Sequence, residues 1–166
     1  DGVQVAVATP KLRPEDAGAT EVVTDLAKAA ADHQKSCDGG DLGACSELGL
    51  DHLYARGAKK DLARAVELFQ KAGDGGNPAG CNNLGGRYSA GEGVTKDPLT
   101  AAALYCVAAR AGNAEAQYNL GWMYANGRGV EKDDAFASSF FALAAKSGHA
   151  YAQKMLARIG SSQGEL

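Results

Sequence analysis

Residues 113–148 read NAEAQYNLGWMYANGRGVEKDDAFASSFFALAAKSG, and the same pattern stands 36 residues earlier and again 36 residues before that. Leu120-Gly121 recurs as Leu84-Gly85 and as Leu48-Gly49. A glycine closes every unit, at positions 40, 76, 112 and 148. A fixed period without insertions is typical of a solenoid of helix pairs, in which each unit buries its apolar face only against its neighbours. The sequence therefore predicts an all-α array.

Each unit carries the signals of two helices, and the unit 77–112 shows them most clearly. Asn77-Pro78 supplies a capping residue followed by proline at the first helical position, and Asp97-Pro98 does the same for a second helix. The glycine-rich stretch 91–94 lies between them as a turn. Gly85 stands where the second helix must approach closely. We therefore expect antiparallel helix pairs in three full repeats, 41–76, 77–112 and 113–148.

The flanks of these repeats match only parts of a unit. Residues 21–40 resemble the second helix alone, and residues 149–160 resemble the first helix alone. We expect residues 1–20 to be extended or disordered and residues 161–166 to be a linker or tail. Because the chain starts at Asp1 and not at Met, we expect a mature or excised fragment of a longer protein.

Composition narrows the classes of partner. The formal net charge is −3 and no basic run is present, which argues against nucleic acid and against an anionic membrane surface. No apolar stretch approaches the roughly 20 residues that span a bilayer. We expect a monomer that does not insert into membranes.

No motif of an enzyme is present, so we expect no catalytic residues and no cofactor. The turn Gly127-Arg-Gly129-Val130 is not a phosphate loop, because it joins two helices and lacks the Gly-Lys-Ser/Thr sequence. Neither Ser-x-x-Lys nor His-Glu-x-x-His occurs. His33 and Cys37 are four residues apart on a predicted helix, but no further ligands stand at zinc-type spacing, so a metal site is disfavoured.

The pattern resembles the Sel-1-like repeat, a relative of the tetratricopeptide repeat. The residues that match the motif are Ala114-Glu-Ala116, Leu120-Gly121, Tyr124, Gly127-Arg-Gly129-Val130 and Asp133. The resemblance covers about residues 25–159. It implies a right-handed superhelix whose first helices line a concave groove, and an adaptor role in bacterial cell envelopes or in eukaryotic protein quality control. The family as a whole has no shared catalytic residues.

The four cysteines are interpreted partly through this resemblance. Cys37 and Cys45 resemble a pair found in the cysteine-rich bacterial branch of the family, where a disulfide joins the end of one unit to the start of the next; the alternative is two buried thiols. The position that would pair with Cys81 in this way holds Gly73. Antiparallel helices that turn near Val94 place residue 81 opposite about residue 108, so we predict a Cys81–Cys106 disulfide, with two free buried thiols as the alternative. Cysteines paired in this way indicate a periplasmic or secreted protein.

Tetratricopeptide-like geometry implies which first-helix positions face the groove. The strongest candidates for partner binding are Glu47, Asn82, Asn83, Tyr118, Asn119 and Trp122. Asparagine amides bind an extended peptide backbone through paired donors and acceptors, and aromatic anchors often dominate binding energy. The alternative is that Tyr118 and Trp122 only pack against a neighbouring helix.

We favour a non-enzymatic scaffold of the bacterial envelope that binds a partner peptide or helix in the groove. The alternative is a module for glycan or peptidoglycan fragments, in which Trp122 and Tyr118 stack on sugar rings and which targets an associated envelope enzyme. An enzyme in its own right is the weakest hypothesis.

Overall fold

The computed structural model describes residues 16–162, and these residues form eight α-helices and no strand. The helices are α1 (Asp16–Asp38), α2 (Leu42–Tyr54), α3 (Leu62–Asp74), α4 (Pro78–Ala90), α5 (Pro98–Arg110), α6 (Ala114–Asn126), α7 (Asp134–Lys146) and α8 (Ala150–Ser162). The helices α2 to α7 form three pairs that coincide with the three predicted repeats. The predicted all-α solenoid of helix pairs is confirmed.

Both end helices are longer than the sequence pattern predicts. Helix α1 begins at Asp16, so residues 16–20 are helical and the prediction of an extended segment is wrong for them. This stretch contains alanines at positions 17 and 19 and no proline, so the sequence allows the helix to start before residue 21. Helix α8 likewise includes residues 161 and 162, which were expected in the tail. The rest of the two predicted terminal segments, residues 1–15 and 163–166, lies outside the described residues.

The helix starts repeat with the same period as the sequence. From α2 to α8, a side chain immediately before the helix accepts a hydrogen bond from a backbone N–H of the first turn, which is otherwise unpaired. Aspartates do this for the second helices, at Asp61, Asp97 and Asp133. The first helices α2, α4 and α6 have Asp41, Asn77 and Asn113, and α8 has His149, whose Nδ1 accepts from the N–H of Ala152.

Glycine and an aromatic ring hold the two helices of a pair together. A methyl group added at Gly49 would lie 2.5 Å from the ring of Phe69, and the same conflict recurs between Gly85 and Tyr105. Gly121 and Phe141 form the third such pair. Only a residue without a Cβ lets the ring pack flat on the helix backbone. The close approach predicted from the Leu-Gly motif is therefore confirmed.

A second glycine position controls the contact between units. Gly93, in the turn after α4, has a φ of +76°, and a Cβ there would lie 2.7 Å from the carbonyl oxygen of Leu62 on the preceding unit. Gly57 and Gly129 repeat this arrangement against Leu26 and Pro98. The turn therefore needs glycine both for its left-handed backbone and for lack of space.

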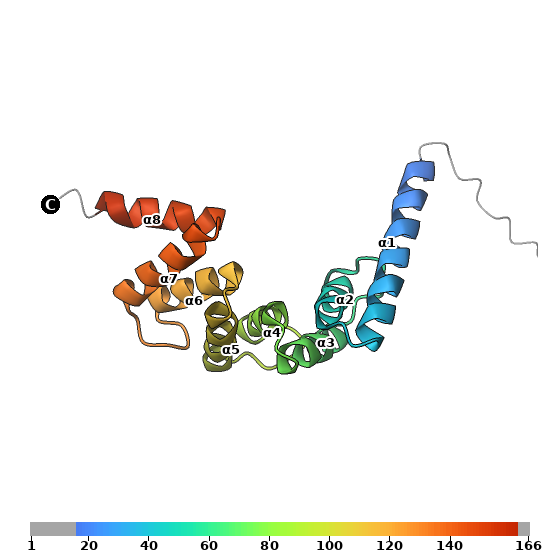
Figure 1. The fold of residues 1–166 in the computed structure, drawn as a ribbon, viewed down its shortest axis with the longest axis horizontal. Helices are drawn as coiled ribbons and strands as arrows, with labels where there is room; N and C mark the ends of the chain where they lie inside the picture. The colour runs from blue at the N-terminus through green and yellow to red at the C-terminus, as the bar shows by residue number, and fades with distance from the viewer. Residues whose placement is uncertain (1–15, 163–166) are drawn as a thin grey trace, which may run out of the picture.

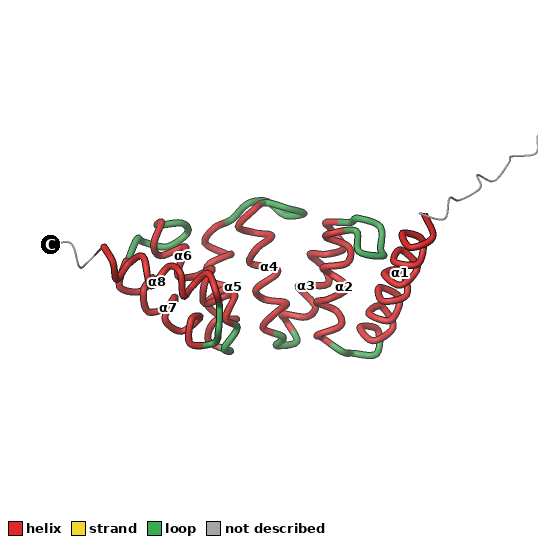
Figure 2. The backbone as a smooth tube through the Cα atoms, turned by 90° about the horizontal axis from the view of Figure 1, so that it is seen from above, coloured by secondary structure: helices red, strands yellow, loops and turns green. Residues whose placement is uncertain are grey.

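The pairs stack into a curved array (Figure 1). Each second helix packs against its own first helix and against the first helix of the next unit, so contacts are local along the chain. In Figure 1 the array is an arc with α1 and α8 at its ends, α2 and α4 on the inner side and α3 and α5 on the outer side. Seen from above in Figure 2, the turns within units gather at one edge and the turns between units at the other.

Candidate functional site on the inner face

The solvent-facing side of the first helices is the surface on which the predicted binding residues fall. Successive residues of an α-helix are rotated by about 100°. Because Leu120 and Gly121 are buried, the middle of the opposite side of α6 is formed by Glu115, Trp122 and Asn126, all exposed. We call this side of α2, α4, α6 and α8 the inner face. Its middle positions on the other helices are Leu50 and Tyr54, Ala79, Gly86 and Ala90, and Tyr151.

The predicted asparagines lie where neighbouring first helices contact each other. The amide Nδ2 of Asn83 donates to Ser46 Oγ on α2 at 3.0 Å. The amide Nδ2 of Asn119 donates to Asn82 Oδ1 on α4 at 3.1 Å. The asparagines therefore connect successive units. Each is half-buried, and none of their amide atoms is a buried atom without a partner. The remaining amide N–H groups and oxygens lie within reach of solvent.

Tyr118 is less available than the sequence pattern suggested. Its ring stacks on the imidazole of His149, with centroids 4.6 Å apart, and it also contacts Phe141. His149 is held in place from both sides, since its Nε2 lies 2.8 Å from Glu115 Oε2 and its Nδ1 caps α8. Tyr118 therefore packs mainly against the next unit, as the structural alternative proposed.

Trp122 remains open to solvent. Its exposed fraction is 36%, and the guanidinium carbon of Arg128 lies 5.4 Å from its ring centroid. The ring lies in the middle of the inner face, at a position held by Leu50 and Gly86 in the other units. Of the two predicted aromatic residues, Trp122 is the one with the exposed ring.

Glu47 lies at the other end of the inner face, in a small pocket between α1 and α2. The pocket has a volume of about 140 Å³ and is lined by Leu26, Ala29, His33, Glu47, Asp51 and Arg56. Arg56 reaches Glu47 at 3.4 Å and Asp51 at 3.1 Å, and His33 Nδ1 lies 2.7 Å from Asp51. The carboxylate of Glu47 is thus already partly neutralised within the chain.

Comparison with known proteins agrees with this architecture. The model of the Sel1 repeat family matches residues 43–77, 78–113 and 114–149. The chain belongs to the Sel1 repeat family. The matched ranges begin two or one residues after the predicted unit boundaries at 41, 77 and 113 and keep the same phase.

Solved structures of other Sel1 proteins are similar to this one. A protective antigen of uropathogenic Escherichia coli with an SLR fold is 34% identical with a TM-score of 0.73, over 80% of this chain and 28% of that one. A Sel1 repeat protein from Oxalobacter formigenes is 28% identical with a TM-score of 0.75, over 78% and 52%. Cysteine-rich protein B of Helicobacter pylori is 27% identical with a TM-score of 0.65, over 81% and 97%. Comparison with curated protein sequences gives no match.

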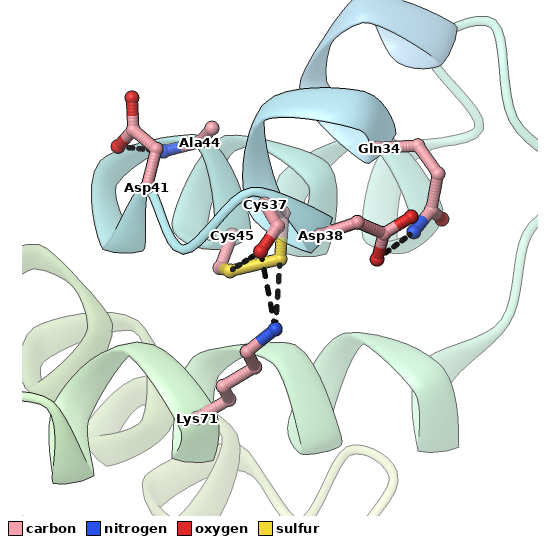
Figure 3. Close-up of a disulfide and its surroundings, with 7 residues drawn as sticks. All are labelled: Gln34, Cys37, Asp38, Asp41, Ala44, Cys45 and Lys71. Atoms are coloured by element: carbon pink, nitrogen blue, oxygen red, sulfur yellow. Dashed lines mark hydrogen bonds between the residues drawn. A yellow bond between two sulfur atoms is a disulfide. The ribbon is translucent and has the colours of Figure 1, made fainter.

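The disulfide between the N-terminal half repeat and the first full unit is present as predicted. Cys37 and Cys45 are bonded, and their Cα atoms lie 4.6 Å apart. Figure 3 shows the bridge at the end of α1, with the ammonium group of Lys71 donating to the Cys37 carbonyl at 3.2 Å. Because the Cys37 sulfur is part of a disulfide, it is not a thiolate ligand, and the disfavoured metal site with His33 has lost one of its ligands.

The predicted Cys81–Cys106 disulfide is wrong, because both residues are free thiols. The prediction considered only how far along the two helices the cysteines lie. Cys81 is on the side of α4 that faces the preceding unit. Its Sγ points to the carbonyl oxygen of Gly73 at 3.8 Å, just as Cys45 Sγ approaches the Cys37 carbonyl. Burial, and in second place the nearby Asp74 carboxylate, raises the pKa of the Cys81 thiol.

Within residues 16–162, no group of three His, Cys, Asp or Glu side chains is arranged to hold a metal ion. Among the helices of the same range, none has the length and apolar character needed to cross a bilayer. Burial raises the pKa of Tyr105 to about 12. That ring packs on Gly85 inside the core, so the raised pKa reflects packing.

Proposed function

We propose that this Sel1 repeat protein is a non-enzymatic scaffold that binds a peptide segment of a partner protein along its inner face, as a monomer. The observation that carries the proposal is the exposed Trp122 ring in the middle of that face, beside asparagine amides with spare donors and acceptors. Sel1 repeat proteins are generally protein-interaction scaffolds, which agrees with this use of the surface.

The small residues of α4 suit an extended segment. Ala79, Gly86 and Ala90 form the middle of the inner face on this helix and leave the backbone of a partner room to approach. Asn82 and Asn83 stand at its margins, where their free amide groups are placed to pair with a partner's backbone N–H and C=O groups.

We further propose that the protein works in the bacterial cell envelope. The Cys37–Cys45 disulfide and the likeness to cysteine-rich protein B of Helicobacter pylori support an oxidising compartment. Mass spectrometry of the native protein, alkylated after unfolding without reductant, should show two modified thiols. Four modified thiols would contradict the envelope location.

A glycan-binding module is the second candidate. It is favoured by the exposed ring of Tyr151, whose exposed fraction is 65% and which lies on the same face as Trp122. Flat exposed rings also stack on sugars, so a peptidoglycan fragment would fit here in place of a peptide.

The test is capture from an envelope extract by immobilised wild type and two variants. Trp122→Ala should lose the bound protein, because the anchor on the inner face is removed. Leu143→Ala is the matched control, since Leu143 is 49% exposed on the second helix α7, away from the inner face. Retention of a protein by wild type and control, and its loss from Trp122→Ala, supports the scaffold. Capture of murein fragments alone would favour the glycan module, and equal capture by all three would place binding elsewhere.

A further inference from the structure

An ion pair recurs at equivalent positions of the first two units, with its charges exchanged. In the first unit Asp51, near the end of α2, pairs with Arg56 in the following turn at 3.1 Å. In the second unit the corresponding residues are Arg87 and Glu92, and they also form an ion pair. Acid and base have changed places, but both units neutralise this position within the chain.

The third unit keeps the base and lacks the acid. The residue that corresponds to Asp51 and Arg87 is Met123, which is buried with an exposed fraction of 2%. Arg128 corresponds to Arg56, is exposed, and has no ion pair with an acidic residue in the described part of the chain. It lies instead against the ring of Trp122. The inner face therefore has one unneutralised guanidinium at this position, next to its most exposed ring on α6.

Two acidic groups of the neighbourhood are already engaged, and the exposed Glu131, three residues after Arg128, forms no ion pair with it in the described part of the chain. Glu115, on the same face of α6, is bound to His149 at 2.8 Å, and Asp134 lies 3.7 Å from Lys132. A second cation follows on α8, where Lys154 Nζ lies 5.5 Å from the centroid of the Tyr151 ring. The inner face over α6 and α8 thus combines cations with aromatic rings, whereas over α1 and α2 the cation Arg56 is shared by two carboxylates.

We propose that Trp122 and Arg128 together bind an acidic segment of the partner protein, in which an Asp or Glu stands next to an apolar residue. This inference rests on the proposed function and specifies the chemistry of the peptide. A guanidinium that stacks on an aromatic ring keeps its in-plane N–H groups free, and their geometry matches the two oxygens of a carboxylate. The remaining surface of the indole takes the neighbouring apolar side chain. The partner's acid would neutralise Arg128, as Asp51 neutralises Arg56 and Glu92 neutralises Arg87 within the chain in the other units.

The experiment uses three synthetic peptides, ALEFELA, ALQFQLA and ALKFKLA, titrated into the intact protein. The chain contains one tryptophan, and the peptides contain none, so the fluorescence of Trp122 reports directly on binding at the Trp122–Arg128 site. We expect ALEFELA to bind about fivefold more tightly than ALQFQLA at low salt, the upper range for an exposed ion pair. The difference should shrink as salt screens the charges. ALKFKLA should bind most weakly.

Two variants make the result specific. Arg128→Gln should bind ALEFELA and ALQFQLA equally, and Arg128→Glu should reverse the order in favour of ALKFKLA. Arg110→Gln is the matched control, because Arg110 is an exposed arginine at the end of α5 and its loss should leave the order unchanged. In Arg128→Glu the peptide ALKFKLA should bind more tightly than it does to the wild type. A misfolded variant would lose binding and could not produce this gain.

Equal binding of all three peptides to the wild type, or an order that persists in Arg128→Gln, would overturn the acidic specificity. If that charge-independent binding were lost in Trp122→Ala, the inner face would still be the binding surface and the proposed function would stand. An unchanged Trp122 signal with every peptide would overturn the inference, and the capture experiment would then decide on the proposed function separately.

Discussion

Single residues decide how each repeat departs from its neighbours. The clearest case is the turn between units, where Cys37 pairs with Cys45 but Gly73 stands opposite Cys81. The two sites are otherwise alike, since Cys45 Sγ points to the carbonyl oxygen of Cys37 and Cys81 Sγ points to that of Gly73. One glycine therefore determines whether a covalent bond joins two units.

Gly73→Cys should form a second disulfide with Cys81. A Cβ added at Gly73 lies 3.1 Å from Cys81 Sγ, which matches the separation of about 3 Å that bond geometry requires across a disulfide. The closed loop of nine residues, 73 to 81, would stabilise the protein by about 2.5 kcal/mol on the chain-entropy model. Thermal unfolding with and without reductant measures this. Gly73→Ser, similar in size but unable to form the bond, is the control, and a stabilisation equal to that of the serine variant would refute the prediction.

Asp97 should make the stability of the protein depend on pH in the acidic range, through its cap on α5. The hydroxyl of Thr100 donates to this carboxylate at 2.6 Å, and together with the N–H groups of Thr100 and Leu99 it lowers the pKa of Asp97. A lowered pKa in the folded state means that the contribution is complete above the unfolded-state value of about 3.9. It is lost as the pH falls through the lower folded-state value.

The measurement is urea unfolding of the wild type and of Asp97→Asn at pH 6, 4 and below. Asparagine still caps a helix but does not titrate. We expect the wild type to be more stable at pH 6 and this advantage to narrow below about pH 4. A constant difference between the two proteins across this range would show that the carboxylate charge has no role.

At the scale of secondary structure elements, turn geometry determines how the helix pairs stack. The turn between α6 and α7 holds two glycines with positive φ, Gly127 at +62° and Gly129 at +72°. Only the second lies against the preceding unit, where a Cβ would overlap the carbonyl group of Pro98. Ala55 occupies the position of Gly127 in the first unit with a φ of +56°, so a side chain is tolerated there.

Gly127→Ala and Gly129→Ala therefore form a matched pair. The first should reduce the free energy of unfolding by about 1 kcal/mol, the cost of a left-handed non-glycine residue. The second should cost about twice as much or more, because α5 must also move away from the turn. Denaturant unfolding of both variants provides the comparison. An equal decrease in the free energy of unfolding of the two variants would mean that the contact with Pro98 does not contribute to stability.

At the scale of the whole molecule, contacts between helices join consecutive helices and, to a lesser extent, successive first helices such as α2 and α4. The core accordingly consists of successive clusters, around Cys37 and Leu48, Phe69, Tyr105 and Phe141. In an array of this kind stability is approximately a sum over units and their interfaces. Damage at one end should therefore not spread to the other.

Reduction of the Cys37–Cys45 disulfide tests this. Hydrogen exchange should accelerate in α1 and α2, which the bond joins, and remain unchanged in α6 and α7. The measurement is exchange with mass spectrometry on the native and the reduced protein. A uniform acceleration along the chain would instead show that the array unfolds as one cooperative unit.

The sequence by itself determined the repeat, the helix pairs, the capping residues and the glycine of the Leu-Gly motif, because each depends on residues of the same unit. The glycine of the turn is required in addition by its contact with the preceding unit. Only the tertiary structure decided the roles of the side chains between units. Asn83 and Asn119 proved to donate to the preceding first helix, Tyr118 to stack on His149, and Cys81 to face Gly73. Such contacts depend on how far each helix is rotated against the next, and a rotation of one residue, about 100°, exchanges a solvent-facing position for a buried one.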